Sequence, residues 1–277
     1  MSEALQRFGV GALTHLIHCL YVATFCNGFF CNPIKCLSSE IRQVLVSFSK
    51  MLMECYVDFT YSNKCQEYLS KVQEFIDKHI APIASDVYAF MHHQNNHGNW
   101  REWQLHPEVE RLKVLSREQG LANLFLPDTE LGQGLTTLEY APLAEAMGHY
   151  LFAPEVFNCN APDTGNMEVL YHFGSEAQKT QWLTPLLNGE IRSVFGMTEP
   201  DVASSDATNM QARIAFARDE LVLNERNLWS TGLGHPNAKL IIFMGLSIPD
   251  NDRQETPSMV LAPVDREGLT IQRMLTA

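Results

Sequence analysis

Residues 194–206 offer the side chains and backbone best suited to bind a ligand, and they read VFGMTEPDVASSD. The apolar start is typical of a β-strand, and the hydroxyls of Thr198, Ser204 and Ser205 follow where that strand would end. Because this stretch has no Lys or Arg, a bound anion would depend on backbone N–H groups and hydroxyls. These groups favour a neutral, planar ligand that is rich in hydrogen-bonding atoms and carries a diphosphate tail.

A second motif, Trp229-Ser230-Thr231-Gly232, follows the first after another pair of strand-like segments. Each motif also has a plainer interpretation. The first would be a strand that runs into a Ser/Asp turn whose side chains cap their own backbone, and composition alone favours this. The second would be a core Trp beside a strand Thr, with its indole N–H satisfied. The order and spacing of the two motifs keep the ligand-binding interpretation open.

Other polar residues are weaker candidates for chemistry. Glu199 and Asp201 could in principle transfer protons, but beside an expected strand they are better suited to terminate it. No metal ligand is predicted, because the histidines lack the spacing of a metal site and suit the surface or helix caps. These histidines are His92, His93, His97, His149 and His172.

The elements that would position the motifs begin with helices over residues 63–190. Pro107 opens one helix that Gly120 ends, and a polar His- and Asn-rich loop is expected before it, at residues 91–103. Apolar residues at helical spacing predict an earlier helix through Val72, Phe75, Ile76, Ile80 and Ile83. Capping-box patterns begin two later helices, one at Thr136 with Glu139 and one at Ser175 with Gln178.

The hydrophobic period changes from helical to alternating near Ile191. Apolar and polar residues alternate over 210–216, and short apolar runs at 221–223, 240–243 and 259–261 add further strands. Helices first and strands second indicate an α+β fold. We therefore expect an N-terminal helical bundle over 63–190 and a partial, antiparallel, β-barrel-like domain over 191–277.

The composition excludes one class of function and sets the first 62 residues apart. With 277 residues, 45% of them hydrophobic, the chain can fold as one large or two modest domains. Its net charge of −12 and its lack of a Lys/Arg cluster argue against nucleic-acid binding. Every cysteine except Cys159 falls within residues 1–65, without a C-x-x-C pair. Residues 1–62 are therefore interpreted as an atypical Cys-rich leader.

Residues 8–31 of this leader carry no charge and are long enough to span a bilayer. However, His15, His18 and Asn27 interrupt the apolar run, and Arg7 is its one positive flank on the N-terminal side. A membrane tether is therefore less favoured than a buried or non-native leader.

A longer series of motifs leads from the helical part into the first strand: Gly174-Ser175-Glu176-x-Gln178-Lys179, Trp182-Leu183-x-Pro185-Leu186, Gly189-Glu190 and Phe195-Gly196-Met197-Thr198-Glu199-Pro200. This order resembles the helix-to-strand junction of the acyl-CoA dehydrogenase family, and the resemblance covers about residues 65–277. The DVASSDATN and WSTG versions are most similar to members 10 and 11 of that family. In those proteins the region follows a phosphotransferase-like domain, which is absent here.

The resemblance implies that the two motifs bind FAD. The implied cofactor-binding residues are Phe195, Gly196, Met197, Thr198, Glu199, Pro200, Asp201, Val202, Ala203, Ser204 and Ser205, followed by Trp229, Ser230 and Thr231. Ser205 would also face the CoA end of an acyl-CoA substrate. The implied reaction is α,β-dehydrogenation of acyl-CoA thioesters in fatty-acid β-oxidation. Electron-transfer flavoprotein or another acceptor would take the electrons, in mitochondria or peroxisomes, and the full-length protein would be a homo-oligomer.

The family's catalytic carboxylate lies in a second, C-terminal helical domain, so the resemblance assigns no catalytic residue within this sequence. We therefore expect a fragment that carries recognition elements for FAD and acyl-CoA but lacks the base. The alternative is a non-catalytic, truncated isoform that acts as a partner-binding module.

Overall fold

The computed structural model describes residues 60–97, 99–203, 206–218, 220–247 and 255–275. The chain divides into two units after Thr60, and almost all described residues belong to the second unit. The expectations for a Cys-rich leader and for a membrane tether at 8–31 therefore fall on residues that the structure does not describe, apart from 60–62. Within the described ranges, no helix is both long and apolar enough to cross a membrane.

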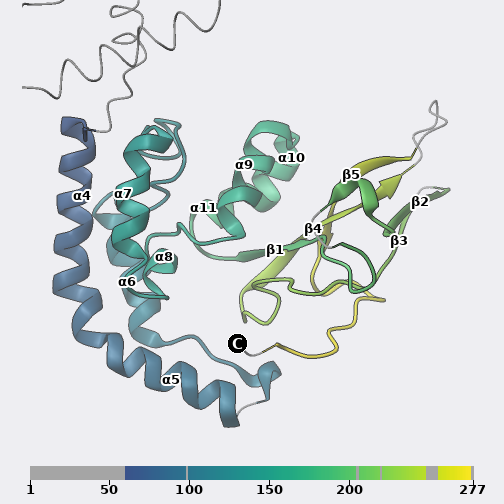
Figure 1. Cartoon of the computed structure of the whole chain (residues 1–277), viewed down its shortest axis with the longest axis horizontal. Helices are drawn as coiled ribbons and strands as arrows, with labels where there is room; N and C mark the ends of the chain where they lie inside the picture. The colour runs from purple at the N-terminus through teal and green to yellow at the C-terminus, as the bar shows by residue number, and fades with distance from the viewer. Residues whose placement is uncertain (1–59, 98, 204–205, 219, 248–254, 276–277) are drawn as a thin grey trace, which may run out of the picture. The chain divides into compact units, whose positions relative to one another are not determined.

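The helical region begins with one long helical segment that changes its geometry twice. Ser62 caps its start by accepting a hydrogen bond from the Cys65 N–H. The segment buries an apolar stripe at the predicted positions, including Val72, Phe75 and Ile76. It runs through α4 (Asn63–Phe75), the π-helical turn η2 (Ile76–Ile80), the 3-10 turn η3 (Ala81–Ile83) and α5 (Ala84–His97), as Figure 1 shows.

The predicted loop at 91–103 is wrong in its first half, because α5 continues to His97. The His92 and His93 side chains are exposed, where a helix tolerates polar residues. Contacts with the following segment also support the end of α5. The Trp103 indole N–H donates to the Gln94 carbonyl at 3.2 Å, and the Gln104 N–H donates to the Gln94 side chain at 2.6 Å. The short 3-10 turn η4 (Trp100–Glu102) lies within the connection.

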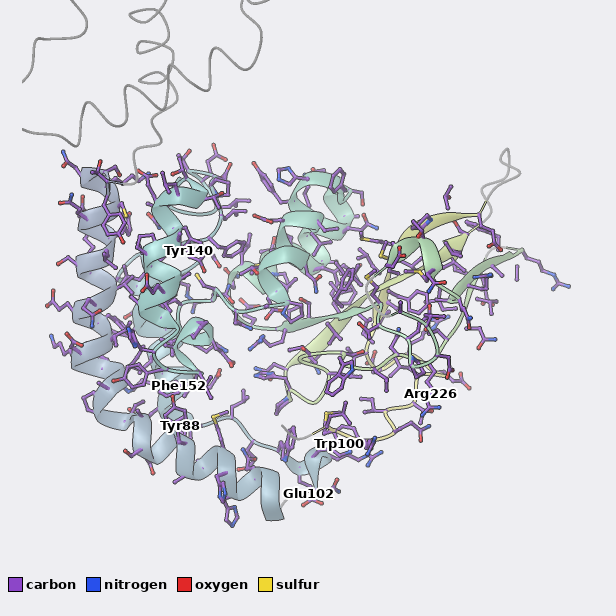
Figure 2. The ribbon with its side chains drawn as sticks, viewed as in Figure 1. Tyr88, Trp100, Glu102, Tyr140, Phe152 and Arg226 are labelled. Carbon is purple, nitrogen blue, oxygen red and sulfur yellow. The ribbon has the colours of Figure 1, made fainter. Side chains whose placement is uncertain are left out.

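The remaining helices pack against this segment around one apolar core. Both predicted capping boxes are confirmed, at Thr136 and at Ser175. Phe75 packs edge-on against Phe157 at 5.2 Å, and Tyr88 of α5 packs edge-on against Phe152 at 5.8 Å (Figure 2). These helices are α6 (Pro107–Glu118), α7 (Thr137–Met147), α8 (Ala153–Val156), α9 (Asp163–Phe173), α10 (Glu176–Gln178), η5 (Lys179–Leu183) and α11 (Thr184–Leu187).

The sheet is built around its longest strand, β4. Strand β1 runs parallel to the first half of β4, and β2 runs parallel to its last two residues on the same edge. Strand β5 pairs antiparallel along the whole opposite edge, and β3 pairs antiparallel with β2. The strands are β1 (Arg192–Gly196), β2 (Arg213–Ala217), β3 (Glu220–Asn224), β4 (Ala238–Ser247) and β5 (Thr256–Pro263).

The α+β fold class is confirmed, but the sheet is mixed and open instead of antiparallel throughout. Residue alternation predicts which face a side chain occupies, and it does not predict strand direction. The long connection between β1 and β4 contains the β2–β3 hairpin. It returns the chain to the starting end of β1, so β4 runs parallel to β1. Phe216 lies beyond the part of β2 that pairs with β4, which is why it is 62% exposed despite the alternation.

Buried polar side chains join α9 to the start of β1. The Asp163 carboxylate is 1% exposed and binds the Arg192 guanidinium. It also accepts hydrogen bonds from the Ser193 N–H at 2.6 Å and the Ser193 hydroxyl at 2.5 Å. Asn166, one helical turn later, donates to the Ser193 Oγ at 2.9 Å and to the Val194 carbonyl at 3.2 Å. Together these bonds fix the strand's position against the helical region.

Glu155 of α8 extends this cluster. Its Oε1 lies 3.0 Å from Arg192 Nη1, 3.1 Å from His235 Nε2 and 3.8 Å from Lys113 Nζ. Because His235 Nδ1 accepts the Asn237 N–H at 3.1 Å, the ring carries its proton on Nε2, toward Glu155. Burial of Glu155 opposes its ionisation, but the His235 hydrogen bond and the charges of Arg192 and Lys113 outweigh that and lower its pKa to about 2.

We predict that Asp163→Ala is strongly destabilising, because it leaves Arg192 buried with half of its ionic partners removed and Ser193 without its acceptor. Loss of one partner of a buried pair costs about 3–5 kcal/mol. Urea unfolding of the full chain measures this loss. Glu67→Ala is the matched control, since it breaks the exposed Lys71–Glu67 pair and should leave the free energy of unfolding nearly unchanged. Equal, small effects of the two substitutions would contradict the assignment.

Candidate functional site

Strand β1 positions the first predicted motif. Val194 is 1% exposed, Gly196 is buried against β4, and the chain leaves the sheet after Gly196. Met197 and Thr198 are half-buried where the loop begins, and Met197 packs on the apolar cluster of the sheet. The predicted site residues Phe195 and Gly196 are thus the end of a strand, and 197–203 are its loop. Ser204 and Ser205 lie outside the described residues.

The second motif lies directly beside this loop, although it is about thirty residues later in the sequence. The Thr198 carbonyl accepts a hydrogen bond from the Leu228 N–H at 2.7 Å and a longer one from the Asn227 side chain at 3.4 Å. Further along, Gly232 passes close to β1, so that a Cβ at this position would lie 3.1 Å from the Ser193 carbonyl. The structure therefore brings the two predicted segments together along β1.

Trp229 lies at the exposed tip of the second segment. Its side chain is 69% exposed and its φ is +55°, a left-handed conformation that non-glycine residues seldom adopt. The Thr231 N–H donates to the Trp229 carbonyl at 2.8 Å and closes the turn, with the half-buried Ser230 between them. The plainer interpretation of Trp229 as a core residue in a strand is wrong. The exposed turn offers an aromatic face and the Thr231 hydroxyl to a ligand.

The loop after β1 also offers backbone donors. No described residue accepts a hydrogen bond from the N–H groups of Asp201, Val202 or Ala203, and Asp201 and Ala203 are exposed. Asp206 behaves as the plainer interpretation of the Ser/Asp turn expects. Its carboxylate accepts from the Thr208 N–H at 2.9 Å and from the Thr208 hydroxyl at 2.6 Å, which caps the 3-10 turn η6 (Ala207–Asn209).

Glu199 anchors the loop and does not point its carboxylate into solvent. The side chain is 6% exposed and accepts hydrogen bonds from the Gln211 N–H, at 2.9 and 3.0 Å, and from the Ala212 N–H, at 2.8 Å. Glu225, beyond the end of β3, lies next to it. Burial first, and the neighbouring Glu199 second, raise the pKa of Glu225 to about 7.

Sequence reasoning missed Glu225 and Asn227, although the hairpin carried a usable signal. In the β2–β3 register Arg213 pairs with Asn224, so the next pair along would be Ala212 opposite Glu225. Extending the register by this one pair would have placed Glu225 opposite Ala212, whose N–H donates to Glu199. No local signal identifies Asn227. Within the described part of the chain, no group of three or more His, Cys, Asp or Glu side chains could hold a metal ion.

Comparisons with known proteins identify relatives for most of the chain. Residues 62–190 match the family model described as the acyl-CoA dehydrogenase N-terminal domain. Over 220 residues the chain is 46% identical to acyl-CoA dehydrogenase family member 11 of Gallus gallus, which covers 79% of this chain and 28% of that protein. It is 43% identical over 208 residues to family member 10 of Mus musculus, which covers 73% of this chain and 19% of that protein. The chain thus spans less than a third of the length of these relatives.

Solved structures give the same result for the fold. A protein from Mycobacterium abscessus, assigned as an acyl-CoA dehydrogenase, superposes with a TM-score of 0.72 and 53% identity, covering 78% of this chain and 54% of that one. Glutaryl-CoA dehydrogenase from Mycobacterium smegmatis, solved in complex with FADH2, gives a TM-score of 0.56 at 22% identity. That match covers 78% of this chain and 50% of the other, and at this identity it bears on the fold alone.

We predict that Gly232→Ala destabilises the protein more than Gly268→Ala does. Both glycines have φ near +90°, so both substitutions add about 1–2 kcal/mol of left-handed strain. An added Cβ meets the Ser193 carbonyl only at Gly232, because at Gly268 nothing lies within 4 Å. Urea unfolding of the two variants separates the close approach from the shared strain. Equal losses would show that the turn is not held against β1.

Proposed function

Because this chain belongs to the acyl-CoA dehydrogenase family, we propose that its two adjacent segments bind FAD and the CoA end of an acyl-CoA in α,β-dehydrogenation. The observation that carries the proposal is the hydrogen bond from the Leu228 N–H to the Thr198 carbonyl. It sets the exposed Trp229 and Thr231 beside a loop whose backbone N–H groups have no described acceptor.

The donors present suit the cofactor. The hydroxyls of Thr198 and Thr231 and the face of Trp229 would hold the polar, planar ring system. The N–H groups of 201–203 would hold the diphosphate without a basic side chain. Ser204 and Ser205 would add hydroxyls, and Ser205 would also meet the substrate. Bound FAD would supply the chemistry of accepting a hydride from the acyl β-carbon.

The described residues near the loop bind and orient, and we assign none of them as the base. Glu199 is occupied by two backbone N–H groups, and Glu225 is half-buried beside it. The remaining carboxylate of the loop, Asp201, is exposed to solvent. We propose that the complete enzyme is a homo-oligomer that uses electron-transfer flavoprotein or another acceptor, in mitochondria or peroxisomes.

We predict that Thr198→Val and Thr231→Val each weaken FAD binding about threefold to tenfold. Each substitution keeps the shape and β propensity but removes a hydroxyl whose hydrogen bond contributes about 0.5–1.5 kcal/mol. The measurement is a titration of flavin fluorescence with the full chain. Thr180→Val, on the exposed surface of η5, is the control and should leave affinity unchanged. Unchanged affinity in both site variants would overturn the site assignment.

We further predict that this chain alone gives little or no acyl-CoA-dependent dye reduction, even where it binds flavin. The physical reason is that no described carboxylate beside the loop is available to remove the substrate's α-proton. Steady-state dye reduction with a series of acyl-CoA chain lengths measures this. Turnover at rates typical of the family would require a base within residues 1–277 and would contradict this account of the site.

A further inference from the structure

We propose that Glu199 and Glu225 form a proton-sensitive latch that positions the flavin loop, closed when the pair holds one proton and loosened when both carboxyls are ionised. The effect on flavin binding rests on the proposed function, whereas the latch itself is a property of the described residues. Neither side chain would contact the reacting atoms, so both act as positioning residues.

The first half of the latch is the anchoring of Glu199. Its carboxylate is buried and is fixed by the N–H groups of Gln211 and Ala212, just before β2. These hydrogen bonds hold the Glu199 side chain in one place, so it stays at a fixed position beside Glu225. Because Glu199 directly follows Thr198, this anchor holds the flavin loop against the entry of β2.

The second half is the position of Glu225. It directly follows Asn224, which pairs with Arg213 at the end of the hairpin, and its side chain lies beside that of Glu199. Its Oε2 is buried and has no hydrogen-bond partner among the described residues. An ionised carboxylate is costly in such a place, whereas a protonated one has an acidic hydrogen to donate to Glu199.

Among the residues that the structure describes, no cation offsets the charge of Glu225. Glu199, from the loop after β1, is the titratable group that acts on Glu225. Arg213 of β2 pairs with Glu255 at 3.3 Å and donates to the Gln211 carbonyl at 2.9 Å, and its side chain is exposed. Arg226, in the same segment as Glu225, is exposed and is labelled in Figure 2. Burial and Glu199 accordingly raise the pKa of Glu225 to about 7.

The pair can act on the flavin site because each carboxyl lies near one end of the hydrogen bond from the Leu228 N–H to the Thr198 carbonyl. This bond joins the two segments of the site. Glu199 follows Thr198, whose carbonyl is the acceptor, and Glu225 precedes Asn227 and Leu228, which are the donors. When Glu225 ionises, two like charges repel across this bond, and the segment that carries Trp229 is pushed away from the loop. Flavin affinity should therefore fall as pH rises through about 7.

The test compares FAD affinity of the full chain at pH 6 and pH 8.5 with that of Glu225→Gln. The amide keeps the shape and the donor of the protonated acid but cannot ionise. We expect the parent to lose affinity by roughly threefold or more at the higher pH, and Glu225→Gln to retain it. Glu220→Gln, an exposed change in β3, should behave like the parent. The same pH dependence in the parent and in Glu225→Gln would overturn the latch.

A second readout without flavin separates the latch from the proposed function. A carboxyl with a raised pKa makes the folded state less stable as pH rises from its unfolded value, near 4.5, to about 7. Urea unfolding should therefore show Glu225→Gln equal to the parent near pH 5 and more stable at pH 8.5. If FAD does not bind at all, the proposed function fails, and the unfolding curves still decide the latch. Parallel pH profiles for the parent and Glu225→Gln would reject it.

Discussion

The ionic contact between Asp163 and Arg192 is the interaction on which the rest of this structure depends. Both side chains are buried, and Arg192 is also paired with Glu155, so displacing Asp163 or Arg192 leaves a buried charge with fewer partners. Asp163 also binds the N–H and the hydroxyl of Ser193, so one carboxylate fixes the first two residues of β1 to α9. This anchor positions β1, which ends at Gly196, where the loop of residues 197–203 begins.

Two glutamates in this protein show how the environment of a carboxylate sets its pKa. Glu155 is half-buried but faces Arg192, His235 and Lys113, and its pKa falls to about 2. Glu225 is also half-buried, but it faces another carboxylate, and its pKa rises to about 7. The first environment holds the helix–sheet junction together across the neutral pH range. The second makes the contact between the two loop segments responsive to pH in that range.

Local signals made much of the fold predictable, and tertiary contacts account for what was missed. Capping boxes identified two helix starts correctly, and the apolar run before Met197 correctly indicated a strand. The length of α5 was missed because its end depends on contacts of Gln94 with Trp103, which lie outside the helix. The parallel pairing of β4 depends on the course of the crossover, which alternation does not encode. Asn227 was missed because its partner, the Thr198 carbonyl, is known only from the fold.

The central claim is that the loop after β1 and the turn at Trp229 form one flavin-binding surface. Hydrogen exchange of the full chain, measured with and without saturating FAD, tests it most directly. The account predicts slower exchange at residues 197–203 and 227–232 together, with α4 and α6 unchanged. Flavin-dependent protection confined to the helical region, or to only one of the two segments, would contradict it.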